Sequence, residues 1–167
     1  GLTEEIAAGI VFQVDGNYSA AKHLLEKDEH AIFNLQVFQK WMRACLKFDV
    51  AKVMESVEDL ATAGRERQKQ FLGYALEMIR ESLLVNYADA SMIRIAGEEK
   101  NFVVKFAPFV HAANAQRFMS EINLAILHIE RNGSAKIIFL DLSFKANDLL
   151  RMPNPDAVIQ PSANVKS

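Results

Sequence analysis

Residues 65–87 have the sequence RERQKQFLGYALEMIRESLLVNY, and this stretch carries the clearest helical period in the chain. Its apolar residues recur at steps of three and four, as the positions on one face of an α-helix do. They are Leu72, Leu76, Ile79 and Leu83, with Phe71, Ala75 and Leu84 widening the stripe. A face this broad is normally buried against more than one neighbour, so the stretch predicts a central helix within a helical body.

A second long helix is predicted over residues 114–131, on the C-terminal side of this stretch. Its apolar residues in helical register are Phe118, Ile122, Ala125, Ile126 and Ile129. The run Asn132-Gly133-Ser134 is expected to end it, with Gly133 in the left-handed conformation that stops a helix and Ser134 as the cap of the next one.

Residues 136–144, KIIFLDLSF, are ambiguous because β-branched and aromatic residues suit a buried strand as well as a helix. The apolar positions continue onto one helical face, which carries Ile138, Leu142, Ala146 and Leu149. No other segment offers a partner strand, so we predict a helix over residues 134–150.

Shorter helices are predicted on the N-terminal side. Asp49 is a suitable N-cap for a helix that ends before Gly64, and residues 29–48 form the helix that precedes it. The helix over residues 29–48 is expected to bury Ile32, Leu35, Phe38, Met42 and Leu46. A charged break at residues 26–29 is expected to separate it from a short helix over 18–25, and another short helix opens at Thr3.

The remaining segments are short or polar. Residues 88–100 are predicted to form a loop, and residues 102–109 a short apolar helix that ends near Pro108. With only 7 Gly and 4 Pro in 167 residues, the chain lacks the residues that tight turns between strands need. The predicted fold class is therefore all-α.

The totals exclude some classes of function. The 21 acidic and 19 basic residues give a formal net charge of −2, so no overall field draws the chain to nucleic acid or an anionic membrane. No stretch approaches the roughly 20 apolar residues of a membrane span. The single cysteine, Cys45, excludes an internal disulfide, indicates a reducing intracellular setting, and is expected to be a buried free thiol.

The usual signatures of catalysis are missing from the sequence. It has no glycine-rich phosphate loop, and its four histidines do not form a metal-ligand pattern. The adjacent pair Glu98-Glu99 is expected to be solvated rather than an acid/base pair. We therefore predict no catalytic residue, no cofactor and no metal site.

The C-terminal half contains three strings that resemble a known family. They are FAPFVHAANA from Phe106 to Ala115, HIERNG from His128 to Gly133, and KIIFLDLS from Lys136 to Ser143. The short segment Glu121-Ile122-Asn123 lies between the first two. Together they resemble the C-terminal domain of the delta-prime subunit of bacterial DNA polymerase III, in the form found in Bacteroidetes-like bacteria. That subunit is the stator of the sliding-clamp loader.

The resemblance extends more weakly to the N-terminal side. The segment from Ile10 to Leu25 is similar to the end of the helical lid in AAA+ modules of clamp-loader subunits. ATP-binding members of that family carry a nucleotide-sensing arginine after the Gly-Asn or Gly-Ser pair. Tyr18 and Ser19 stand there in this sequence, which agrees with a delta-prime-type subunit that does not bind ATP.

Residues 152–167 contain Pro153, Pro155 and Pro161 among small polar residues, and this composition predicts a disordered tail. The resemblance implies two further parts, residues 1–27 as the end of the lid and residues 28–151 as a helical collar domain. It implies a non-catalytic cytoplasmic scaffold that packs with the delta and tau/gamma subunits, contacts DNA only through the complex, and binds no membrane or small-molecule substrate. Candidate subunit contacts lie on the exposed flanks of the last two helices, at Arg117, Arg131, Lys136 and Lys145.

A helical ligand-binding domain, such as the regulatory half of a bacterial transcription factor, is the alternative interpretation. It requires a cavity between helices that is lined by Phe and Met side chains. Met78, Phe118 and Met119 are the candidates for such a lining.

Overall fold

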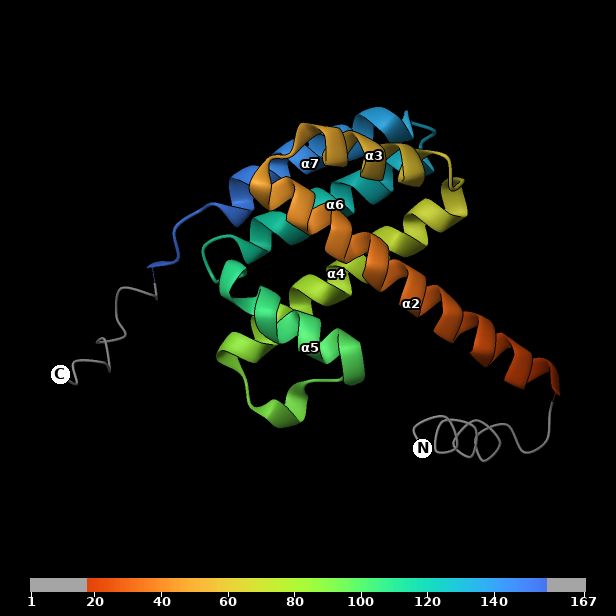
Figure 1. Cartoon of the computed structure of the whole chain (residues 1–167), viewed down its shortest axis with the longest axis horizontal. Helices are drawn as coiled ribbons and strands as arrows, with labels where there is room; N and C mark the ends of the chain where they lie inside the picture. The colour runs from red at the N-terminus through yellow and green to blue at the C-terminus, as the bar shows by residue number, and fades with distance from the viewer. Residues whose placement is uncertain (1–17, 156–167) are drawn as a thin grey trace. The chain divides into compact units, whose positions relative to one another are not determined.

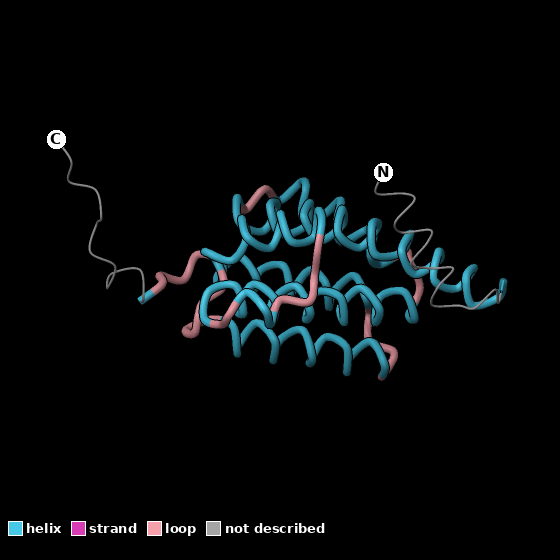
Figure 2. Tube along the Cα trace, turned by 90° about the horizontal axis from the view of Figure 1, so that it is seen from below, coloured by secondary structure: helices cyan, strands magenta, loops and turns pink. Residues whose placement is uncertain are grey.

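The computed structural model describes the backbone of residues 18–155, and the side chains of residues 29–89 and 91–155. This part of the chain is all-helical and contains no strand, as Figure 2 shows. Its α-helices are α2 (Tyr18–Lys47), α3 (Val50–Ala61), α4 (Arg65–Tyr87), α5 (Gly97–Phe106), α6 (Ala115–Glu130) and α7 (Ala135–Leu150). Two 3-10 helices, η1 (Ala90–Met92) and η2 (Ala107–Phe109), flank α5. The helix predicted from Thr3 and the tail beyond residue 155 lie outside the described residues.

The chain divides into two units, residues 1–36 and residues 37–167. In the first unit, α2 runs without interruption through residues 26–29, so the predicted charged break was wrong. That run contains neither Gly nor Pro, and Glu and Lys are good helix formers. Ile32 was predicted to be buried but is 59% exposed.

The second unit is built around α4, as the helical period of residues 65–87 predicted. The helix buries Phe71, Leu72, Ala75, Met78 and Ile79, while Leu76 and Leu83 of the predicted stripe are partly buried against the same core. It packs most extensively against α6 and also against α5, while α7 packs against both α6 and α3. The helices α3, α7, α6, α4 and α5 therefore follow one another in space, each beside the next (Figure 1).

Residues 37–47 of α2 lie across this row of helices. The Trp41 ring contacts Phe71 of α4 and Phe139 of α7, at ring-centroid distances of 5.8 and 6.3 Å. Its Nε1 donates a hydrogen bond of 2.8 Å to Ser143 Oγ. One turn further along α2, the Cys45 carbonyl accepts a hydrogen bond from Asn147 Nδ2. These two polar contacts fix the register of α2 on α7.

The turn from α6 to α7 follows the predicted capping, except that Asn132 and Gly133 exchange their predicted roles. Ser134 caps α7 by accepting from the Ile137 amide, which confirms the prediction. The left-handed residue after α6, however, is Asn132 (φ 63°) and not Gly133. Asn is the non-glycine residue that adopts this conformation most readily. Gly133 is needed for space instead, because a Cβ there would lie 2.9 Å from both the His128 carbonyl oxygen and Ile138 Cδ1.

A comparable turn joins α2 to α3. Phe48 adopts a left-handed conformation (φ 52°), and the Asp49 amide bonds back to the Ala44 carbonyl. Asp49 then caps α3 by accepting from the Lys52 amide, as predicted. A phenylalanine in this conformation is strained by about 1–2 kcal/mol relative to right-handed backbone. Its half-exposed ring lies against Phe144 of α7, with ring centroids 5.9 Å apart.

The segment after α4 is more ordered than predicted. Residues 88–100 were expected to form a loop, but they include η1 and the first turn of α5. The Glu81 carboxylate, almost fully buried on α4, accepts a hydrogen bond of 3.3 Å from the Arg94 amide and so holds this connection.

Candidate functional site

The first of the three strings, residues 106–115, forms a hydrogen-bonded connection between α5 and α6. Asn114 is fully buried in it. Its Nδ2 donates to the carbonyls of Phe109 and Leu149, each at 2.9 Å, and its Oδ1 accepts from the His111 amide. One side chain therefore ties this connection to the C-terminal end of α7.

Two further side chains hold the same connection. Asn86 of α4 donates to the carbonyls of Ala107 and Val110. The His111 ring, which is also buried, contacts the Met152 carbonyl through Nε2 at 3.1 Å. The roles of His111 and Asn114 in the structure are thus to organise backbone. Asn123 and His128, the other polar members of the strings, are exposed on α6.

Two of the four predicted contact residues form ion pairs within the chain. Lys136 pairs with Glu58 of α3, and Lys145 pairs with Glu121 of α6 and Asp141 of α7, at 2.9 Å each. Hydrogen bonds to these two carboxylates raise the pKa of Lys145. Both lysines therefore join helices of the bundle, and any partner must compete with carboxylates that are already in place.

Arg117 and Arg131 lie at opposite ends of α6 and are exposed. Between them on the outer side of the helix lie Leu124 and Leu127, which are 41% and 38% exposed. On the neighbouring α7, Ile137 is 68% exposed. We call these five residues the α6/α7 face. The buried core of a protein interface is mostly apolar and interfaces are enriched in arginine, so these exposed aliphatic residues and arginines together fit a contact surface.

The Cys45 thiol is fully buried, as predicted. Burial raises its pKa to about 12, and a hydrogen bond with Ser143 offsets only part of this effect. A thiol that stays protonated at neutral pH and is shielded from solvent is a poor nucleophile. The arrangement suits a packing role for this side chain.

The raised pKa predicts how stability depends on pH. The unfolded thiol ionises from its ordinary value of 9.0, while the folded thiol keeps its proton up to about 12. Above pH 9 ionisation of the exposed thiol therefore stabilises the unfolded state, and the free energy of unfolding should fall by about 1.4 kcal/mol per pH unit on account of Cys45. Urea unfolding of the wild type and Cys45→Ala should diverge between pH 8 and pH 10, with the shallower pH dependence in Cys45→Ala. Parallel pH profiles would contradict the assignment.

The pair Glu98-Glu99 at the start of α5 does not act as a unit. Glu98 is exposed, whereas Glu99 is half-buried and accepts a hydrogen bond of 3.0 Å from the Tyr74 hydroxyl. Burial raises the pKa of Glu99, although the hydrogen bond from Tyr74 lowers it. The described residues contain no cluster of three or more His, Cys, Asp and Glu side chains arranged to hold a metal ion.

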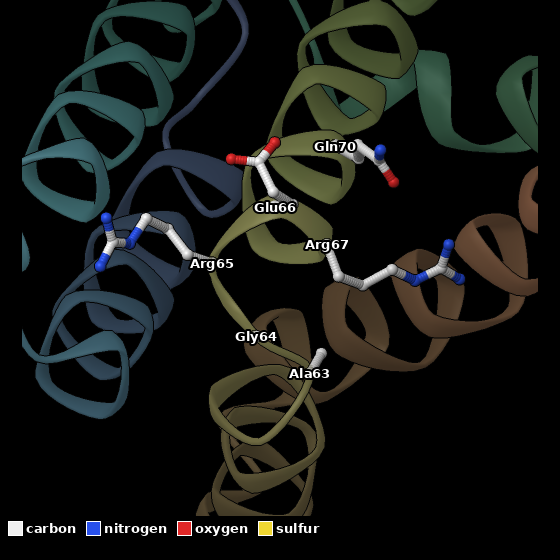
Figure 3. Close-up of a pocket in the computed structure, with 6 residues that line it drawn as sticks. All are labelled: Ala63, Gly64, Arg65, Glu66, Arg67 and Gln70. Atoms are coloured by element: carbon white, nitrogen blue, oxygen red, sulfur yellow. The ribbon is translucent and has the colours of Figure 1, made fainter.

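A surface hollow of about 620 Å³ lies at the N-terminal end of α4. It is lined by Gly64 (φ 86°), Arg65, Arg67 and their neighbours (Figure 3). Figure 3 shows the Arg65 and Arg67 side chains pointing to opposite sides of the helix. Their guanidinium groups do not converge on one ligand position, so the hollow is an open surface between helix ends.

The residues proposed to line a ligand cavity are part of the core. Met78 and Phe118 are buried, and Met119 packs against the same apolar cluster. None of them lines the hollow at the start of α4, the groove between α2 and α5, or the small hollow between α6 and α7. Among the described helices, none is sufficiently long and apolar to span a membrane.

Comparison with known proteins identifies no relative. No protein-family model, no curated protein and no solved structure matches the chain.

Proposed function

We propose that this chain is a non-catalytic scaffold domain of the bacterial DNA polymerase III clamp loader, of the delta-prime type. It packs in the collar with the delta and tau/gamma subunits, so that the complex can load the sliding clamp during DNA replication. In this role it works in the cytoplasm, meets DNA only through the complex, and needs no cofactor or small-molecule substrate.

The observation that carries the proposal is the α6/α7 face. Leu124, Leu127 and Ile137 expose apolar area on two adjacent helices, with Arg117 and Arg131 at the ends of α6. Ring assemblies of helical domains need such faces, since each subunit must bury part of its surface against a neighbour. The three strings that resemble the delta-prime subunit also lie on or beside these two helices.

The internal construction of the bundle supports the same role. Hydrogen bonds from Trp41 and Asn147 fix α2 on α7, and Asn114 fixes the start of α6 at the end of α7. A scaffold of this kind presents its outer face in one geometry, which lowers the entropic cost of association.

The proposal is tested by placing a charge in the face. Leu127→Glu should weaken binding to a complex of delta and tau/gamma subunits at least about thirty-fold, the effect of losing a contact worth about 2 kcal/mol. The matched control is Val104→Glu, because Val104 of α5 is 50% exposed and lies outside the face. Binding is measured by calorimetry. Equal affinities for the two variants would exclude the α6/α7 face as the contact surface.

A further inference from the structure

A groove of about 240 Å³ runs between residues 37–47 of α2 and the α5–η2 segment. Its apolar lining includes Met42, Phe102, Phe106 and Phe109, and two exposed cations, Arg43 and Lys105, border it. Within the described part of the chain, neither cation forms an ion pair with a carboxylate. The groove therefore combines an apolar floor with uncompensated positive charge, and fits a segment that carries aliphatic side chains and an acidic group.

The C-terminal end of α7 lies at one end of this groove. Asn114 Nδ2 donates to the Phe109 and Leu149 carbonyls at once, so these two backbone positions are neighbours. Three residues after Leu149, the Met152 carbonyl contacts the His111 ring. The chain thus leaves the body of the domain beside Phe109, which lines the groove.

The residues that follow have the matching chemistry. Residues 153–167 read PNPDAVIQPSANVKS and place Asp156 just before Val158 and Ile159. Extended chain covers about 3.3–3.6 Å per residue, whereas a helix rises about 1.5 Å per residue. About three residues of extended chain therefore cover the same length as the two helical turns from Phe102 to Phe109. The segment from residue 153 is long enough to bring Asp156 to Lys105, and its two aliphatic residues to the far end of the groove.

We propose that the segment Asp156–Ile159 of this chain binds in the groove between α2 and α5, with Asp156 between Arg43 and Lys105 and with Val158 and Ile159 on the phenylalanine floor. Pro155 and Pro161 bracket the segment and favour extended backbone. Attachment to α7 gives the segment an effective concentration of the order of millimolar, so weak contacts suffice to keep it bound. The proposal is independent of the proposed function, since it concerns a different face of the domain.

The methyl group of Met42 reports on the groove directly. In the full chain labelled with ¹³C-methyl methionine, and assigned with Met42→Leu, this resonance should shift when residues 156–167 are deleted. A synthetic peptide of residues 153–167 added to the shortened chain should restore the original shift saturably. In the full chain, Lys105→Glu should reproduce the effect of the deletion, and adding Asp156→Lys to it should reverse that effect. Lys100→Glu, an exposed change outside the groove on the same helix, is the matched control and should leave the resonance in place.

The results of these experiments show whether the C-terminal segment or a second copy of the chain occupies the groove. A Met42 resonance that is the same with and without residues 156–167 overturns the proposal. So does a shift that depends on protein concentration and accompanies a doubling of mass, because the occupant is then a second copy of the chain. Failure of Asp156→Lys to rescue Lys105→Glu also overturns the pairing. None of these results bears on binding at the α6/α7 face.

Discussion

Replacing Asn114 with Ala should lower the free energy of unfolding by about 3–5 kcal/mol. The substitution leaves the Phe109 and Leu149 carbonyls without their shared donor and the His111 amide without its acceptor, in a fully buried position. Each buried polar group left unsatisfied costs about 1–3 kcal/mol. For a chain of this length the melting temperature should fall by about 10 °C.

Asn123→Ala is the control for this prediction. Asn123 lies on the same helix and in the same resemblance, but it is exposed, so its loss should change stability by less than about 0.5 kcal/mol. Urea unfolding of the two variants measures the difference. If both variants lose the same small amount, Asn114 does not hold the end of α7 in the way the hydrogen bonds indicate.

A second large effect is expected for Phe38→Ala, at about 3–5 kcal/mol. Phe38 is fully buried, and its ring meets four others edge-on: Trp41, Tyr74, Phe102 and Phe106, at centroid distances of 6.4, 6.3, 5.8 and 5.7 Å. Truncation leaves a cavity where residues 37–47 of α2 meet α4 and α5, and these helices are too firmly packed to fill it.

Phe144→Ala tests whether burial is the cause. Phe144 is 43% exposed and contacts only the Phe48 ring among the aromatic rings described, so its loss should cost less than about 1 kcal/mol. Chemical unfolding of the two alanine variants gives the comparison. Similar losses would mean that the ring cluster around Phe38 is not the centre of the core.

Periodicity predicted much of the fold. The stripe in residues 65–87 located α4, and the helical face from Ile138 to Leu149 resolved the ambiguous run 136–144 as part of α7. The same reasoning failed at residues 26–29, because charged residues without Gly or Pro do not stop a helix. It also failed at Gly133, since sequence does not show which residue of an Asn-Gly pair takes the left-handed conformation.

The candidate site was less accessible to sequence reasoning. Whether a surface lysine is free depends on carboxylates that are distant in sequence, as the pairs of Lys136 with Glu58 and of Lys145 with Glu121 illustrate. The sequence prediction considered only charged residues as contact candidates, and it therefore missed the exposed leucines of α6. Leu124 and Leu127 lie outside the register of Ile122, Ala125 and Ile129, and that mismatch is the signal that identifies them.

The most direct test of the scaffold proposal is the mass of the chain mixed with delta and tau/gamma collar fragments, measured by light scattering at tens of micromolar. We expect a complex whose mass equals the sum of the components, and we expect this complex to be lost when Leu127→Glu replaces the wild type. A mixture that contains only the separate components would contradict the assignment of this domain to the clamp-loader collar.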